Sequence, residues 1–338
     1  MNVDKQNTFS NDIIFVDGLW GTGKSLLGPI VSSMTGIEKV KIEHVYEYTS
    51  CLSSLGKIES DAAIWMLRTY ADLSQYNNTI SREVNLRWGD DSGIGNNPDK
   101  IKYIKRLFSG EGDSKIDEIN RGNLALCVMS HMLMLTPELL PLAYGNRVKV
   151  IEIVRHPLYM FQHWVGYLSR FDSPREFTVS FYHENVKVPW FARDFKNEFV
   201  NMNPTEKAVL CISRLYSLLD EKIQQAKTNG LAVLDLSFEE TVFETNRTLE
   251  KLDQFTNRKH HTRIASILKK QKLPRATLSK GKGHASYGWS SNSKSECEVY
   301  SDLLLYLRNN CSSELQVEMM SLIEWYNIKY PSSLGKYH

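Results

Sequence analysis

The chain alternates short, uninterrupted apolar runs with longer stretches in which apolar residues recur at the spacing of a helix. Four runs are long enough to be strands, and they cover residues 13–16, 124–129, 148–154 and 231–236. Runs without polar alternation are typical of strands that are buried on both faces of a sheet. Helical patterns at residues 158–168 and 205–226 separate the later runs, which predicts parallel strands joined by crossover helices. The expected fold class is α/β, with a parallel sheet between layers of helices.

A long polar and aromatic section lies between the first two runs, at about residues 41–121. Within it, helical spacing predicts helices at residues 62–75 and 98–108, separated by the turn-rich sequence GDDSGIGNNP. Single cores typically stop growing near roughly 250 to 300 residues. The chain is therefore long enough for one large domain or two small ones, and we expect residues 1–338 to form a single domain, in which this section is a helical insertion that covers the functional site.

Composition removes several classes of function. The formal net charge is only +2, which is too small to favour a nucleic-acid or membrane partner by electrostatics. No stretch reaches the roughly 18 uninterrupted apolar residues of a membrane span, so a cytoplasmic location is expected. The five cysteines are far apart and form no C-x-x-C pair, which predicts neither a zinc site nor a disulfide framework. Any anion-binding site must therefore be a small cluster of residues and not a broad basic surface.

The first apolar run leads directly into a phosphate-binding motif, called the P-loop below. Residues 18–25 read GLWGTGKS and satisfy G-x-x-x-x-G-K-[ST], with a predicted strand before them and a helix after them. The glycines remove Cβ atoms that would keep a phosphate away from the backbone N–H groups, and the helix N-terminus adds its dipole. We expect Lys24 to be a solvent-facing catalytic cation. The predicted nucleotide contacts are Gly18, Gly21, Thr22, Gly23, Lys24, Ser25 and Leu26.

Three later segments resemble nucleotide-dependent sulfotransferases. Residues 124–168 resemble that family's strand with a catalytic histidine, followed by a strand that ends in an R-x-P turn. Residues 231–255 are similar to its strand, acidic turn and helix, and residues 280–289 (KGKGHASYGW) loosely resemble its glycine-rich donor loop. The resemblance implies a P-loop fold with sulfotransferase-like strand order and the donor 3′-phosphoadenosine-5′-phosphosulfate (PAPS).

Carried over position by position, the resemblance assigns individual roles. His131 would be the general base that takes the proton of an acceptor hydroxyl, a task that suits a histidine because its pKa lies near neutral pH. Arg155 would bind the 3′-phosphate of PAPS, and His163 stands where the family has a phosphate-binding serine. The donor loop would contribute Lys280, Gly281 and Lys282. From the residues alone, His131 could also be a core histidine among methionines, and Arg155 could pair at a strand end.

Two departures from the family pattern keep another donor open. Sulfotransferases usually carry a cation at the position of Gly21 and a threonine at that of Lys24, whereas a GKS ending is typical of kinases and ATPases. An ATP and Mg²⁺ dependent small-molecule kinase is therefore the alternative, with Ser25 and Asp235 as metal ligands. A nucleotide-binding regulatory protein without an acceptor is the second alternative. Only the kinase and regulatory-protein interpretations need a metal.

Polar side chains for the acceptor are predicted in the middle section. Arg82 and Arg87 lie in SREVNLRW, and Glu43 and His44 lie in KIEHVYEY. Such a set could hold a carbohydrate or another small acceptor by hydrogen bonds, although a charged helix face explains the arginines equally well. No sequence feature fixes the oligomeric state, and a homo-oligomer is compatible with the chain.

Overall fold

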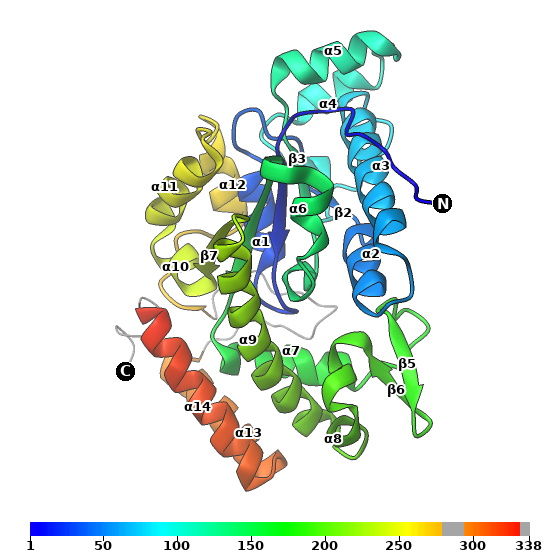
Figure 1. The fold of residues 1–338 in the computed structure, drawn as a ribbon. Coiled ribbons are helices and arrows are strands. Elements are labelled where there is room, and N and C mark those ends of the chain that lie inside the picture. Colours follow the sequence, from blue (N-terminus) through cyan, green and yellow to red (C-terminus); the bar gives the residue numbers. More distant parts are fainter. Residues whose placement is uncertain (279–293, 332–338) are drawn as a thin grey trace.

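The computed structural model describes residues 1–278 and 294–331, and the core of this part is a parallel sheet in the order β2-β3-β1-β4-β7 (Figure 1). The strands are β1 (Ile13–Asp17), β2 (Lys41–Ile42), β3 (Leu126–Met129), β4 (Val148–Val154) and β7 (Ala232–Ser237). The four strands predicted from apolar runs are confirmed to within two residues at each end. The sequence pattern does not reveal β2, because two residues are too few to show a period.

The central strand is β1, and its neighbours β3 and β4 run parallel to it. Val16 is paired with Met129 on one side and with Ile151 on the other, so the carboxyl ends of the three strands lie side by side. Ligands of open α/β sheets bind at this edge. The P-loop follows β1, His131 follows β3 and Arg155 follows β4. The strand order alone therefore collects these three features at one edge.

Side chains of the sheet alternate between two cores, one on each face. Phe15 lies in the first core, whereas Ile14 and Val16 lie in the second. The first core is covered by α2 (Val45–Ser54), α3 (Ser60–Thr79), α6 (Leu139–Tyr144), α7 (Pro157–Leu168), α9 (Pro204–Thr228), α13 (Glu296–Asn310) and α14 (Ser313–Lys329). The second core is covered by α1 (Lys24–Val31), α10 (Phe238–Phe243), α11 (Thr245–Thr256) and α12 (Ile264–Lys270). The predicted three-layer α/β class is confirmed.

Shorter elements lie around these layers. They are α4 (Lys100–Arg106), α5 (Asp113–Gly122), α8 (Lys196–Val200), the antiparallel hairpin of β5 (Ser180–His183) and β6 (Val186–Pro189), and the 3-10 helices η1 (Ile94–Asn96), η2 (Leu133–Leu135), η3 (Gly145–Arg147) and η4 (Trp190–Phe195). The helices predicted at residues 62–75 and 98–108 correspond to α3 and α4. The single domain with an insertion stays a prediction, and β2, at the start of that section, pairs with β3. Within the described residues, no helix combines the length and the apolar character needed to pass through a bilayer.

The P-loop packs against α10 through a glycine. Gly23 has a φ of +105°, and an added Cβ atom would lie 2.4 Å from Cδ2 of Phe238. Phe238 begins α10, is 4% exposed and belongs to the second core. Glycine is therefore required at this position both by the backbone conformation and by the neighbouring ring.

Gly23→Ala should lower the free energy of unfolding by about 2–4 kcal/mol, because left-handed strain and a clash with Phe238 add together. Gly56→Ala is the matched control, since Gly56 has a φ of +65° but no atom within 4 Å of an added Cβ. The control should lose only about 1 kcal/mol. Urea unfolding followed by circular dichroism measures both values. Equal losses of unfolding free energy in the two variants would show that the Phe238 ring moves aside without destabilising the protein.

Candidate active site

Lys24 is folded back onto the loop that carries it. Its Nζ donates hydrogen bonds to the carbonyl oxygens of Gly18 (2.6 Å) and Leu19 (2.7 Å), and the residue is only 5% exposed. The expectation of a solvent-facing cation is wrong, because the loop closes over the ammonium group. Thr22 tightens the same turn through a hydrogen bond from Oγ1 to the Leu19 carbonyl (2.9 Å), whereas Ser25 is exposed.

Two buried carboxyl groups act on Lys24. Asp17 ends β1 and is paired in register with Glu152 of β4, and both side chains are inaccessible to solvent. Asp17 accepts hydrogen bonds from Ser130 Oγ (2.9 Å) and from the backbone N–H of Met134 (2.7 Å). Burial lowers the pKa of Lys24 to about 8, although the nearby carboxylates act to raise it. The charge of Lys24 therefore depends on pH in the range where enzymes work.

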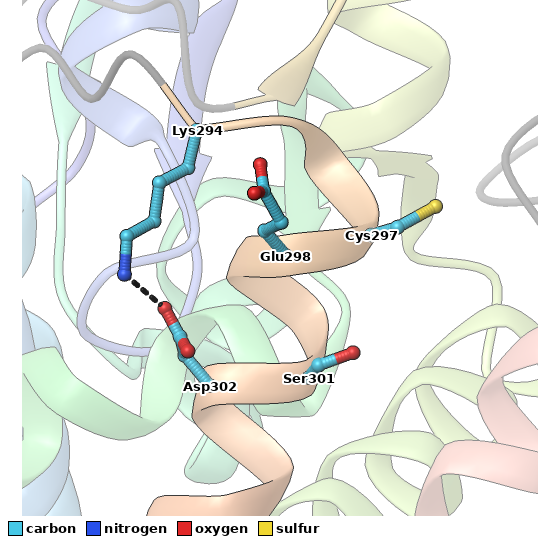
Figure 2. A pocket seen from close by; sticks show the side chains of 5 residues that line it. All are labelled: Lys294, Cys297, Glu298, Ser301 and Asp302. Atoms are coloured by element: carbon cyan, nitrogen blue, oxygen red, sulfur yellow. Dashed lines mark hydrogen bonds and ion pairs between the residues drawn. The ribbon is translucent and has the colours of Figure 1, made fainter.

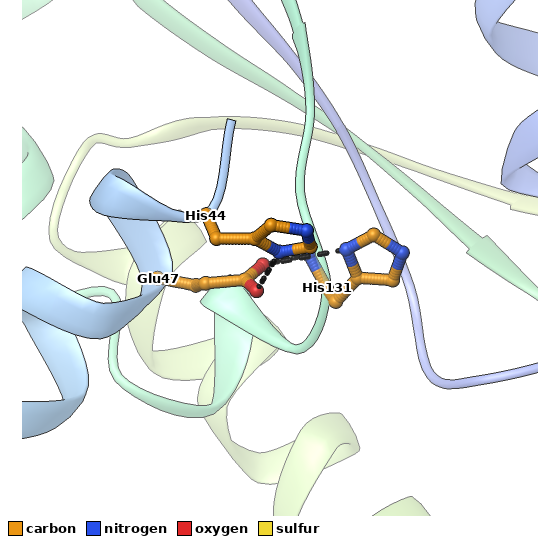
Figure 3. Close-up of side chains that lie close together, drawn as sticks. All are labelled: His44, Glu47 and His131. Carbon is orange, nitrogen blue, oxygen red and sulfur yellow. Dashed lines mark hydrogen bonds and ion pairs between the residues drawn. The ribbon is translucent and has the colours of Figure 1, made fainter. Parts of the chain in front are cut away.

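His131 is held by Glu47 of α2, which also holds His44 (Figure 3). Glu47 Oε2 accepts a hydrogen bond from the backbone N–H of His131 (2.5 Å) and lies 3.4 Å from Nδ1 of its ring. Glu47 Oε1 lies 2.7 Å from Nδ1 of His44. The two imidazole rings stack with their centroids 5.4 Å apart. One carboxylate therefore contacts both histidines.

The surroundings favour a neutral His131. Burial and the charge of Lys24 lower the pKa of His131, and Glu47 offsets this only in part. The side chain is 28% exposed, and its buried nitrogen, Nδ1, makes no hydrogen bond within residues 1–278 and 294–331. A neutral imidazole with one accessible nitrogen can accept the proton of a hydroxyl group.

Arg155 reaches the P-loop from the end of β4. Its Nη1 donates a hydrogen bond to the carbonyl oxygen of Gly21 (3.0 Å), and its guanidinium lies 4.3 Å from the centroid of the Phe238 ring. The backbone N–H of Arg155 donates to Tyr216 Oη (3.1 Å), which fixes the turn after the strand. His163 of α7 is also close, because an added Cβ on Gly21 would lie 3.2 Å from its ring. The structure thus brings Gly21, Arg155 and His163 together.

A second arginine faces the same aromatic ring. Arg275 lies 5.7 Å from the centroid of Phe238, and burial together with the charge of Arg155 lowers its pKa to about 10. Two partly desolvated guanidinium groups around one ring favour a bound anion. Sequence reasoning missed Arg275, because no motif includes it. It also missed Glu47, although a spacing of three residues from His44 puts both side chains on one helix face.

The predicted acceptor residues are only partly brought together. His44 lies against His131, as described above, whereas Glu43 is paired with Lys41 at 2.5 Å. Arg82 pairs with Glu111 at the surface, and Arg87 is 84% exposed. The other predicted donor residues, Lys280, Gly281 and Lys282, lie outside the described residues.

Two arrangements could be considered for a metal. Asp235 is paired with Lys227, lies 3.3 Å from Tyr330 Oη, and belongs to β7, two strands away from β1. The donor atoms of His44, Glu47 and His131 lie within 4.8 Å of one another. However, the ammonium of Lys24 already acts on His131, and a nearby cation disfavours a second one. We therefore interpret this cluster as a hydrogen-bonding unit.

A separate hollow lies on the first turns of α13 (Figure 2). Its lining residues are Lys294, Cys297, Glu298, Ser301 and Asp302, and Lys294 is paired with Asp302 at 2.6 Å. None of these residues follows a strand of the central sheet. The hollow therefore lies along a helix and not at the end of a strand.

Comparison with known proteins gives similarity in structure only. Neither a protein-family model nor a curated protein matches this chain. The sulfotransferase domain of the Synechococcus PCC 7002 olefin synthase matches over 96% of this chain and 97% of its own, with 12% identity and a TM-score of 0.42. The sulfotransferase domain from the curacin biosynthetic pathway matches over 92% and 97%, with 13% identity and a TM-score of 0.41.

A third match is mouse sulfotransferase SULT7A1 complexed with PAP, over 94% of this chain and 85% of its own, with 13% identity and a TM-score of 0.37. The solved structures that this chain resembles are thus sulfotransferases. The assignment of a function rests on the site itself.

Pyrophosphate, a probe of the P-loop, should bind more weakly as the pH rises above about 8, because Lys24 loses its proton there. The sign follows from the lowered pKa: the ammonium exists below about pH 8, and the affinity should fall by up to about tenfold per pH unit above it. Isothermal titration calorimetry from pH 7 to pH 9.5 measures this. Lys24→Met is the control and should bind weakly throughout, and a wild-type affinity that rises with pH would contradict the role of Lys24.

Proposed function

We propose that this protein is a transferase that moves a sulfuryl group from PAPS to a hydroxyl of a carbohydrate or another small acceptor. One observation carries the proposal: Lys24, His131 and Arg155 follow three adjacent parallel strands and surround one phosphate-binding loop. A cation for the leaving oxygen, a neutral base and an additional anion ligand are the groups that such a transfer needs.

The residues present fit a donor that carries anionic groups at two places. The P-loop would hold the 5′-phosphosulfate through its backbone N–H groups and Lys24, while Gly21 and Gly23 pack against the rings of His163 and Phe238. Arg155 and Arg275 form a second cationic position around Phe238, suited to the 3′-phosphate. An ATP-dependent kinase needs the first position but has no use for the second. This pair of positions therefore favours PAPS.

Each side chain then has a definite task. Nε2 of His131 takes the proton of the acceptor hydroxyl while the acceptor oxygen forms its bond to sulfur. Lys24 neutralises the charge that develops on the bridging oxygen as its bond to sulfur breaks. PAPS would supply the sulfuryl group, in line and without a covalent enzyme intermediate. The products would be the sulfated acceptor and adenosine 3′,5′-bisphosphate (PAP).

The kinase alternative is supported less well by the same residues. Mg²⁺ requires accessible oxygen ligands near Ser25. Asp17 is buried with both oxygens hydrogen-bonded, and Asp235 is paired with Lys227. Both carboxylates are therefore already paired with protein groups, and neither is free to bind Mg²⁺.

Arg155→Ala should weaken the binding of PAP by about 10- to 100-fold, because one charge-assisted contact to the 3′-phosphate is lost, and should change ADP affinity much less. Calorimetry of PAPS, PAP, ATP and ADP, each with and without Mg²⁺, measures this. Arg193→Ala, at an exposed arginine, is the control, and melting temperatures show that the variants are folded. Equal weakening of PAP and ADP, or tight Mg²⁺-dependent binding of ATP without binding of PAPS, would favour the kinase.

His131→Ala should bind PAP normally but transfer sulfuryl groups about 10²- to 10⁴-fold more slowly, because a general base acts only on turnover. Transfer of labelled sulfate from PAPS to a panel of small hydroxyl compounds measures the rate. His183→Ala, in the β5–β6 hairpin, is the control and should keep full activity. A His131→Ala protein that melts earlier yet remains fully active would instead identify a core histidine.

A further inference from the structure

The carboxylate of Glu47 stands between two histidines, and each of its oxygens faces a different one (Figure 3). Oε2 binds the backbone N–H of His131 and lies 3.4 Å from its Nδ1, whereas Oε1 lies 2.7 Å from Nδ1 of His44. Glu47 is largely buried, at 9% side-chain exposure, while His44 is 46% exposed. Burying a carboxylate costs free energy unless it is paired, and here both histidines are its partners.

Glu47 fixes the ring of His131 from the side opposite to its reactive nitrogen. Glu47 binds the backbone N–H of His131 and lies 3.4 Å from the buried Nδ1, a charge contact without a hydrogen bond, which restrains the ring while the side chain stays 28% exposed. When Nε2 takes a proton, the ring becomes a cation, and a carboxylate beside Nδ1 stabilises that cation. Loop residues alone could not hold the imidazole in this way, since His131 lies in the irregular segment between β3 and η2.

His44 opposes the effect of Glu47 on His131. Burial would raise the pKa of Glu47, but its contacts with both histidines lower it, so the group is a carboxylate. The hydrogen bond to Glu47 raises the pKa of His44. The groups that act on His131 are thus Lys24 of α1 and His44, which disfavour its protonation, and Glu47 of α2, which favours it. On the side of β1, Asp17 is bonded to Ser130 and Met134.

We propose that Glu47 is the positioning residue of His131, and that His44, bound to the other oxygen of the same carboxylate, limits how strongly Glu47 attracts a proton to His131. This inference rests on the proposed function, in which His131 is the base. The proton leaves the acceptor hydroxyl, binds Nε2 of His131 and is later released to solvent, while the acceptor oxygen bonds to sulfur. Glu47 and His44 keep their covalent structure throughout.

Two substitutions separate this role from a structural one, because they should change the base in opposite directions. Glu47→Gln keeps the shape but removes the charge, so kcat should fall by about 10- to 100-fold and the acid limb of the kcat profile should move to lower pH. His44→Gln frees Glu47 to act on His131, so the acid limb should move to higher pH. PAP affinity should change by less than about twofold in both.

The histidine NMR resonances of the ligand-free protein give a readout that needs no substrate. Glu47→Gln should lower the pKa of His131, and His44→Gln should raise it, with His131→Ala used to assign the signal. Shifts in the same direction, or an unchanged pKa in both variants, would overturn the inference. So would Zn²⁺ binding by the wild type that Glu47→Gln abolishes, because the cluster would then be a metal site.

His131→Ala distinguishes failure of this inference from failure of the proposed function. A slow His131→Ala enzyme beside a fully active Glu47→Gln enzyme would reject only the role of Glu47. A fully active His131→Ala enzyme would reject the base itself and, with it, both proposals. Thermal melts of each variant confirm that the compared proteins are folded.

Discussion

The confinement of the Lys24 ammonium within the P-loop is the interaction on which the site depends. Its two hydrogen bonds to Gly18 and Leu19 hold the loop in shape. Burial disfavours the charged form, while Asp17 and Glu152 support it from the neighbouring strand ends. Together with burial, the same charge lowers the pKa of His131. One cation therefore shapes the loop and contributes to the electrostatic surroundings of His131.

A second constraint is the ring of Phe238, which joins elements from distant parts of the chain. Gly23 of the P-loop, Arg155 after β4 and Arg275 after α12 all meet this side chain. Because the ring belongs to the core beneath the sheet edge, the spacing between the P-loop and the two arginines is fixed by core packing. Under the proposed function, this spacing sets the separation between the sites for the 5′-phosphosulfate and the 3′-phosphate.

The helices of the middle section contribute to the site through α2. Its Glu47 and the preceding His44 reach the end of β3, where His131 lies. Arg82 and Arg87, farther along the same section, are engaged at the surface. The section thus supplies support for the base, whereas its part in acceptor binding stays a prediction.

The sequence by itself determined the four longer strands of the central sheet, several of the large helices and the P-loop motif, because each depends on local patterns: apolar runs, helical spacing and a glycine motif before a helix. It also pointed to His131 and Arg155 through their resemblance to known segments. It could not show that Lys24 is buried or that Arg275 lies beside Arg155, since burial and contacts between distant residues depend on packing. Only the tertiary structure decided that Glu47 stands between His44 and His131, because that contact joins residues 84 positions apart.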